Sequence, residues 1–204
     1  MIDLYTSATG NGRRAALALA ECGLAHVVHR LDLKAEDHKK PEFLKINPAG
    51  SIPVIVDEKG PGGRPINIAQ SGAIVLYCAE KSGKLIPSDP KSRIEAYEWF
   101  MQAATDAAPA SSVLFYLTQL PEQNSATNTY FQQRLLKYCA IADQRLDGRD
   151  YLAGEFSIAD LALYPVVLAR KATIDAAPGF ANLKAWERRI AVRPHTVSAI
   201  AANG

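Results

Sequence analysis

The sequence has few cysteines and histidines, and neither set has the spacing of a metal or redox motif. Cys22, Cys78 and Cys139 lie far apart, and the chain contains no C-x-x-C pair. We therefore expect neither a thioredoxin-type redox pair nor a zinc knuckle. The four histidines include no H-E-x-x-H arrangement. We expect no metal, and we expect the three thiols to be buried apolar groups.

Long apolar runs and a strong net charge are also missing. No apolar stretch approaches the ~20 residues that a membrane span needs. The N-terminal segment places its arginines after a short apolar run, which is not the order of a signal peptide. We therefore expect a cytoplasmic protein without a membrane partner. A formal net charge of +2 is too small to predict a nucleic-acid partner.

What is present is typical of a globular protein with a core of its own. Apolar residues make up 48% of the 204 residues and charged residues 22%. Apolar runs predict strands, and helical spacing of apolar residues predicts helices between them. The strands are expected at residues 2–6, 25–33, 51–57 and 66–69, and the helices at about 11–22, 41–46 and 71–82. The first strand, helix and strand form a βαβ unit, which predicts parallel pairing.

Beyond a polar linker at residues 82–92 the pattern predicts helices only. One helix should begin at Asp89-Pro90 and bury a stripe of apolar side chains, and Pro109 should bend or end it. That stripe consists of Ile94, Tyr97, Met101 and Ala104. A loop over residues 121–129, a helix over 130–146, a capping box from Ser157 to Asp160 and a helix striped by Leu183, Trp186 and Ile190 follow. We therefore predict an α/β domain over residues 1–82 and an all-α domain over residues 91–204.

The segment between the first strand and the first helix is the first candidate site. Glycines at positions 10 and 12 allow the backbone to approach a ligand closely. A helix N-terminus presents free N–H groups and a positive dipole end, which lowers the pKa of a thiol held there. Ser7, Thr9 and Asn11 can add side-chain donors. An ordinary turn with a helix cap is the alternative interpretation.

Two further segments suit the rest of a small peptide. A cis bond at Ile52-Pro53 would leave the backbone of Ile52 able to pair with an extended peptide, although an edge-strand proline is the simpler interpretation. Ser71 and the N–H groups behind it suit a carboxylate, and Gln70 can accept from an ammonium group, although a plain N-cap explains them too. Because ligands of open α/β sheets bind beyond strand ends, the three segments together predict a glutathione site.

The motifs in their order resemble those of bacterial glutathione transferases, over essentially the whole chain. They are Thr9-x-Asn11-Gly12, the stretch at residues 41–48, Ile52-Pro53-Val54, Ser71-Gly72-Ala73-Ile74 and the stretch at residues 154–160. The resemblance is strongest to the Nu-class-like group, which includes disulfide-bond oxidoreductases. It implies a thioredoxin-like N-terminal domain, an all-helical C-terminal domain that forms an electrophile pocket, glutathione as cosubstrate and a homodimer.

The resemblance also implies roles for single residues. Thr9 and Asn11 would meet the glutathione sulfur, with Ser7 as the alternative. Ile52, before the cis Pro53, would pair with the cysteinyl backbone, and His38 would lie near the glycyl end. Two positions depart from the pattern: Gln70 replaces an acidic residue, and Ser51 replaces a basic one. Both changes predict weaker glutathione binding, because charge-assisted hydrogen bonds are the stronger kind.

Three functions stay open at the level of sequence. The bound thiolate can conjugate or reduce a small apolar electrophile, or it can exchange with a disulfide. The third possibility is a glutathione-binding module without turnover. No cysteine of the chain lies in the predicted site, so the nucleophile must come from glutathione. Tyr97, Trp99, Met101 and residues 111–116 are candidates for the electrophile pocket, although core packing competes for most of them.

Overall fold

The computed structural model describes residues 1–122 and 124–203, which divide into two compact units. The first unit combines residues 1–84 with the segment from Val192 onward, and the second is Leu85–Ala191. Residues 192–203 therefore group with the first unit, although they follow the helical segment in the chain. Within the described residues, no helix is both long and apolar enough to span a membrane.

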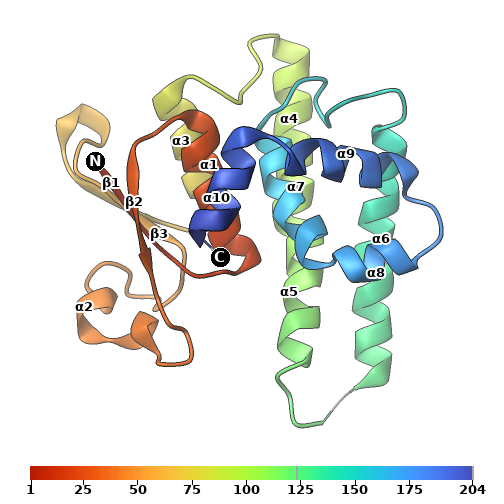
Figure 1. The fold of residues 1–204 in the computed structure, drawn as a ribbon, viewed down its shortest axis with the longest axis horizontal. Helices are drawn as coiled ribbons and strands as arrows, with labels where there is room; N and C mark the ends of the chain where they lie inside the picture. The colour runs from red at the N-terminus through yellow and green to blue at the C-terminus, as the bar shows by residue number, and fades with distance from the viewer. Residues whose placement is uncertain (123, 204) are drawn as a thin grey trace. The chain divides into compact units, whose positions relative to one another are not determined.

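A four-stranded mixed sheet forms the centre of the first unit (Figure 1). Its strands lie in the order β2-β1-β3-β4. The strand β1 pairs in parallel with β2 and antiparallel with β3, which pairs antiparallel with β4. The bounds are β1 (Ile2–Thr6), β2 (His26–Arg30), β3 (Val54–Asp57) and β4 (Ile66–Ala69). The helix α1 (Gly10–Cys22) joins β1 to β2, which confirms the predicted parallel βαβ unit.

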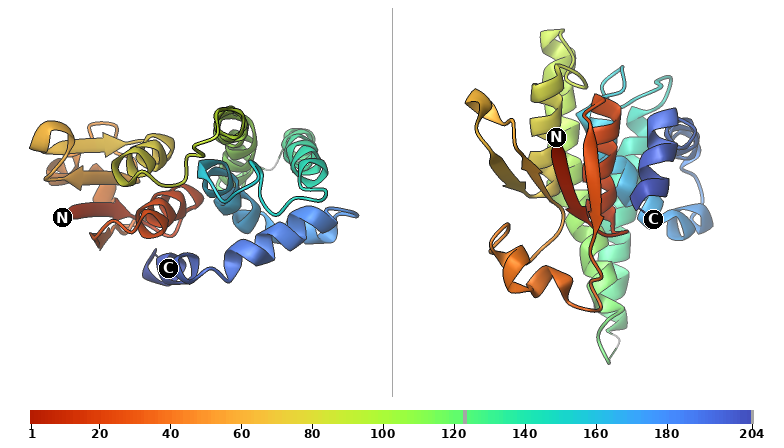
Figure 2. Two further views of the ribbon diagram at one scale, coloured as in Figure 1. Left: turned by 90° about the horizontal axis from the view of Figure 1, so that it is seen from above. Right: turned by 60° about the vertical axis from the view of Figure 1, so that its left-hand side comes forward.

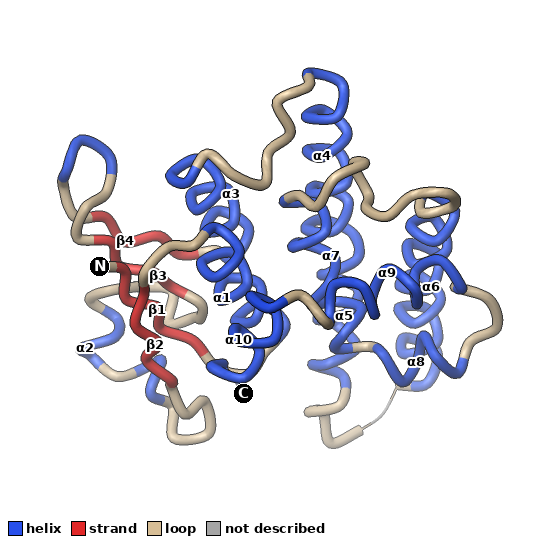
Figure 3. The backbone as a smooth tube through the Cα atoms, turned by 45° about the horizontal axis from the view of Figure 1, so that its top comes forward, coloured by secondary structure: helices blue, strands red, loops and turns tan. Residues whose placement is uncertain are grey.

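Three helices lie together on one side of this sheet, as Figure 3 shows. They are α1, α3 (Ser71–Ser82) and α10 (Pro194–Asn203). The short α2 (Pro41–Leu44) and the 3₁₀ turns η1 (Asp37–Lys39) and η2 (Pro61–Gly63) occupy the connections between strands. The apolar face of α1 is buried as predicted. Gly23 ends that helix with φ of 69°, a left-handed conformation that glycine adopts easily.

The helix α10 is held to α1 by a buried carboxylate. Glu21 of α1 accepts two hydrogen bonds from the Arg193 guanidinium, at 2.9 and 2.7 Å. It also accepts one from the Thr196 hydroxyl at 3.1 Å. Glu21 is only 7% exposed, so this charge-assisted cluster is shielded from water. The periodicity of the sequence contained no signal for this contact, because its partners lie 172 and 175 residues apart.

The second unit consists of helices, joined by loops and by one π-helical turn (Figures 1 and 2). Its helices are α4 (Pro90–Gln102), α5 (Ala108–Leu117), α6 (Ser125–Arg145), α7 (Ile158–Ala169), α8 (Lys171–Ala176) and α9 (Ala181–Ala191). Asp89 caps α4 by accepting from the Ser92 N–H, as predicted. The helix α6 begins earlier than expected because Asn124 caps it, accepting from the Thr127 N–H at 2.9 Å. Gln123, in the predicted loop, lies outside the described residues.

We expected Pro109 to bend or end the helix, and it does not end it. The π turn η3 (Ala103–Ala107) carries the chain from α4 into α5, and the Ala108 N–H donates to the Ala103 carbonyl. Pro109 then occupies the first turn of α5. Proline lacks an N–H group, so a normal helix would leave the carbonyl four residues earlier without its donor. The wider π turn adjusts the hydrogen-bond register just before the proline.

Three of the four residues in the apolar stripe predicted to be buried are instead exposed on α4, whereas the fourth, Ala104, lies in η3 and is partly buried. Ile94, Tyr97 and Met101 are 64%, 38% and 52% exposed, respectively. The buried face of the helix carries Trp99 and Phe100 together with smaller residues. Apolar residues thus lie on two faces of α4, and helical periodicity cannot tell which of them meets the core. The stripe of α9, with Leu183, Trp186 and Ile190, is buried as predicted.

The predicted capping box at the start of α7 is present. The Ser157 side chain accepts from the Ala159 N–H at 3.3 Å, and the Ser157 N–H donates to Asp160 at 3.0 Å. The Trp186 indole also donates to the Asp160 carboxylate, at 2.7 Å. Burial raises the pKa of Asp160 to about 6, although these donors oppose the rise. The box therefore ties α7 and α9 together through one buried carboxyl group.

Candidate active site

The turn between β1 and α1 folds tightly against the first turn of the helix. Thr9 caps the helix: its hydroxyl oxygen accepts from the Gly12 N–H at 3.0 Å. The Thr9 N–H donates to the Ser7 carbonyl at 2.7 Å. A Cβ atom on Gly12 would lie 2.2 Å from that carbonyl oxygen, so only glycine fits this position. The N-cap is therefore Thr9, and Asn11 lies in the first turn.

The cap geometry leaves the hydroxyl proton of Thr9 for another acceptor. A hydroxyl group can accept and donate at once, and the Thr9 oxygen already accepts within the helix. Helix α1 has 13 residues, and the N–H groups of its first turn lie beside this hydroxyl. A thiolate at this point would meet the positive end of the helix dipole and a side-chain donor.

Asn11 belongs to a cluster that links the N-termini of α1 and α3. One terminal nitrogen of the Arg14 guanidinium, Nη1, donates to Asn11 Oδ1 and to Ser71 Oγ, both at 2.8 Å. The Ser71 hydroxyl lies 3.4 Å from the same Asn11 oxygen. Asn11 is exposed, whereas Arg14 is only 4% exposed. Burial lowers the pKa of Arg14 to about 10, which still leaves it charged at neutral pH.

Ser71 does not cap α3, contrary to our expectation. The N-cap is Gln70, whose carbonyl accepts from the Ile74 N–H at 3.0 Å and whose side chain makes no capping bond. Ser71 is the first helical residue, and its hydroxyl is engaged by Arg14. Gln70 has φ of 72° and ψ of 112°, an uncommon conformation for a residue other than glycine. The Gln70 side chain is exposed beside the free N–H groups of the first turn.

The residues assigned to the peptide part of the ligand lie in the same unit. The Ile52-Pro53 bond is cis, as predicted. Ile52 is partly exposed, and it directly precedes the buried Pro53 and Val54. His38 lies in η1, and its buried Nδ1 has no hydrogen-bond partner among the described residues. The carbonyl and the hydroxyl of the exposed Ser51 both accept from the Asn47 amide, at 2.6 and 3.3 Å.

Tyr5 contacts other aromatic side chains. Its ring stacks on His29 of β2, with centroids 4.6 Å apart, and meets Phe43 edge-on at 6.1 Å. Burial and the nearby Asp3 carboxylate raise the pKa of Tyr5, which keeps its hydroxyl protonated. The Tyr5 side chain is partly exposed.

The chain's own thiols do not belong to the site. Cys22, Cys78 and Cys139 are free and buried. Burial raises the pKa of all three thiols, to about 12 for Cys139, so they stay protonated and unreactive at neutral pH. Among the described residues, no group of His, Cys, Asp or Glu side chains is arranged to hold a metal ion.

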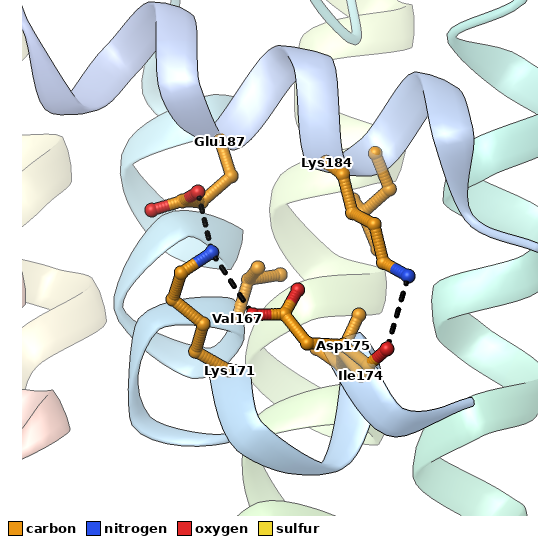
Figure 4. A pocket seen from close by; sticks show the side chains of 7 residues that line it. Val167, Lys171, Ile174, Asp175, Lys184 and Glu187 are labelled. Carbon is orange, nitrogen blue, oxygen red and sulfur yellow. Dashed lines mark hydrogen bonds and ion pairs between the residues drawn. The ribbon is translucent and has the colours of Figure 1, made fainter.

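A small pocket lies between α8 and α9 in the second unit, and the charged side chains that line it bind other groups of the protein (Figure 4). Lys171 pairs with Glu187 at 3.0 Å and with Asp175 at 3.3 Å. The Lys184 ammonium donates to the carbonyl oxygens of Asp175 and Ala177. The charged groups that line the pocket are thus committed to holding the two helices together, and we do not assign a ligand to it.

Two family models match this chain, one in each half. The family model described as the glutathione S-transferase N-terminal domain matches residues 11–81, and the one for the C-terminal domain matches residues 107–194. The chain is 33% identical to the disulfide-bond oxidoreductase YfcG of Escherichia coli, covering 98% of this chain and 94% of that protein. The chain therefore belongs to the glutathione S-transferase family.

Solved structures give the same fold. A glutathione transferase of Pseudomonas putida, with one glutathione disulfide bound per subunit, superposes with a TM-score of 0.90 at 29% identity, covering 100% of this chain and 92% of that one. A second, from Burkholderia graminis, has two glutathione molecules bound per subunit; its TM-score is 0.90 at 30% identity, covering 98% and 87%. The predicted thioredoxin-like domain followed by a helical domain is confirmed.

Sequence reasoning missed Arg14. Its position three residues after Asn11 on a helix permits a contact between the two side chains, so the first half of the cluster had a local signal. The second half had none, since Ser71 lies 57 residues further along the chain.

Proposed function

We propose that this protein binds glutathione in its first unit, lowers the pKa of the bound thiol, and uses the thiolate in thiol–disulfide exchange with small disulfides. One observation carries the proposal. At the N-terminus of α1, Thr9 and Asn11 both have their acceptor oxygens occupied within the protein, which leaves the Thr9 hydroxyl proton and the Asn11 amide hydrogens to donate outward.

The chemistry follows from these donors. A free thiol with a pKa near ~8.5 is only slightly ionised at pH 7. Donors and the helix dipole stabilise the thiolate, which attacks one sulfur of a disulfide and expels the other as a thiolate that takes up a proton. A second glutathione thiolate then attacks the mixed disulfide. The balance is two glutathione thiols oxidised to glutathione disulfide and one disulfide reduced to two thiols.

The remaining contacts complete the proposal. The first-turn N–H groups of α3 at Ser71 would bind the γ-glutamyl carboxylate, and Gln70 would accept from its ammonium group. Ile52 would pair with the cysteinyl backbone, and the unpaired Nδ1 of His38 suits a bond near the glycyl end. Ser7 stays the alternative partner of the sulfur. A cytoplasmic location suits such an enzyme, because glutathione is kept reduced there.

The names of similar proteins favour exchange over conjugation. Two Escherichia coli relatives, YfcG and the 28% identical YghU, are named disulfide-bond oxidoreductases. The two solved structures described above hold glutathione disulfide or two glutathione molecules per subunit. Exchange needs two glutathione molecules in succession, and these complexes are consistent with that need. Addition to an apolar electrophile is the alternative reaction, and activity assays distinguish it from disulfide exchange.

Calorimetry with reduced and with oxidised glutathione, followed by two activity assays, tests the proposal. One assay measures glutathione-dependent reduction of a small dialkyl disulfide, and the other measures conjugation of an aryl halide. We expect both forms of glutathione to bind, and we expect disulfide reduction to be faster than conjugation. No binding would refute the proposed function, binding without turnover would identify a binding module, and conjugation alone would identify an electrophile transferase.

We further propose that the protein is a homodimer through α4. The exposed stripe of Ile94, Tyr97 and Met101 is apolar, lies on one face and would lose contact with water against a second copy. A second copy is the partner that presents the same stripe, as an isologous interface requires.

A further inference from the structure

We propose that Arg14 is a positioning residue: it fixes the Asn11 amide with its nitrogen facing the ligand and holds Asn11 and Ser71 as one unit. The proposal rests on the proposed function, because it takes Asn11 as a partner of the glutathione sulfur and the region of Ser71 as the γ-glutamyl site. Arg14 would then link the reactive end of the ligand site to its anchoring end.

The chemistry of a guanidinium group determines the orientation of Asn11. Arginine has five N–H donors and no acceptor. A group 2.8 Å from Arg14 Nη1 must therefore accept, so the Asn11 oxygen faces Arg14 and the Asn11 nitrogen faces away. With Arg14 removed, the two ends of the amide would be free to exchange places, and the oxygen would repel a thiolate. The direction of the Asn11 donor is thus set by Arg14.

The same nitrogen of Arg14 also restrains Ser71. It donates to the Ser71 hydroxyl at 2.8 Å, and that hydroxyl lies 3.4 Å from the Asn11 oxygen. The three side chains close a small network between the first turns of α1 and α3. Because those turns hold the free N–H groups, the network sets the spacing between the two anion-binding ends of the site.

Packing alone does not explain an arginine at this place. Arg14 is 4% exposed, and desolvating a guanidinium group opposes folding. An apolar side chain of similar length would fill the space without that cost. A direct effect of the cation on the thiolate through space is the competing explanation, since a nearby positive charge also lowers the pKa of a thiol.

The test is a double-mutant cycle in which the pKa of the bound glutathione thiol is measured. The ultraviolet absorbance of the thiolate, recorded as a function of pH, gives that pKa. We expect Arg14→Met and Asn11→Ala each to raise the thiol pKa by roughly one unit, as loss of one donor would. The double variant should show no further rise. Arg14→Met should also raise the KM for glutathione several-fold in the Asn11→Ala background, because its contact with Ser71 is lost independently of Asn11.

Additive rises of the thiol pKa would overturn the proposal in favour of a direct charge effect, and an unchanged pKa in Arg14→Met would overturn it outright. Arg13→Met is the matched control: it removes the same charge from the same helical turn and should leave the thiol pKa unchanged. If Arg14→Met does not fold, Asn11→Asp takes its place, because the carboxylate still accepts from Arg14 but cannot donate. It should raise the thiol pKa at unchanged thermal stability; an unchanged thiol pKa there would also overturn the proposal.

This experiment separates the inference from the proposed function. Calorimetry on the wild type decides whether glutathione binds at all, and failure there removes both. If the wild type binds glutathione with a lowered thiol pKa and the variants do not follow the cycle, only the role of Arg14 is refuted.

Discussion

At the scale of single residues, Thr9 combines two tasks that mutation can separate. Its oxygen caps α1, and its hydroxyl proton is left for the ligand. Thr9→Asp should keep the cap, since aspartate accepts equally well there, but it cannot donate and adds a negative charge. We expect a higher thiol pKa and lower turnover without a loss of thermal stability. Thr9→Ala should lose both tasks and cost about 1 kcal/mol of unfolding free energy.

Two matched variants control this prediction. Thr9→Ser retains both the acceptor and the donor and should behave as the wild type in thiol titration and in denaturant unfolding. Ser7→Ala should leave the thiol pKa unchanged. If Ser7→Ala alone raises it, the sulfur is met by Ser7, and the roles of Thr9 and Asn11 are wrong.

Gln70 sets the strength of glutathione binding in our proposal. The side chain is exposed at the N-cap of α3 and makes no capping hydrogen bond. Gln70→Glu would replace a neutral acceptor by a charged one, and we expect the Kd for glutathione to fall about fivefold. Calorimetry measures it, with Gln70→Ala as the comparison that should bind more weakly than the wild type. Unchanged affinity in Gln70→Glu would place the ammonium group elsewhere.

At the scale of elements, α7 depends on a carboxyl group that is buried together with its donors. The pKa of Asp160 is raised by burial to about 6, from ~3.9 in an unfolded chain. Between these two pKa values the native protein holds a proton on Asp160 that the unfolded chain has released. The stabilisation that this proton provides is therefore complete below about pH 4 and is lost as the pH rises through about 6.

We therefore expect the Asp160→Asn variant to lack this pH dependence. Between pH 4 and pH 7, the free energy of unfolding measured in urea should fall by about 2 to 3 kcal/mol more in the wild type than in the variant. The exposed Asp147→Asn is the control and should follow the wild type. An identical slope in Asp160→Asn would assign the proton uptake to another group.

At the scale of the whole molecule, the exposed stripe of α4 predicts self-association. A charge placed in an apolar interface is desolvated without a partner, so Met101→Glu should shift a dimer to the monomer. Light scattering after size-exclusion chromatography measures the mass. Val197→Glu on α10 is the control, because Val197 is 54% exposed, close to the 52% of Met101, and lies outside the stripe. A monomeric wild type would refute the interface.

Local patterns in the sequence determined most of the fold. The βαβ unit, the start of α4, the capping box of α7 and the buried stripe of α9 follow from apolar periodicity and from caps, which act over a few residues. The same reasoning placed Thr9 and Asn11 at a helix start, where donors for an anion are found. The resemblance of the motifs added the family and the assignment of Ile52 and His38.

Only the tertiary structure decided contacts between residues that are distant in sequence. The apolar stripe of α4 is exposed, because packing against neighbouring elements determines which of the two apolar faces of a helix is buried. The tertiary structure also joined Glu21 to Arg193, and it brought Arg14 of α1 to Ser71 of α3. Local pattern reports what one element can do, whereas a partner 57 or 172 residues away is fixed by the packing of whole helices, and no periodicity encodes that distance.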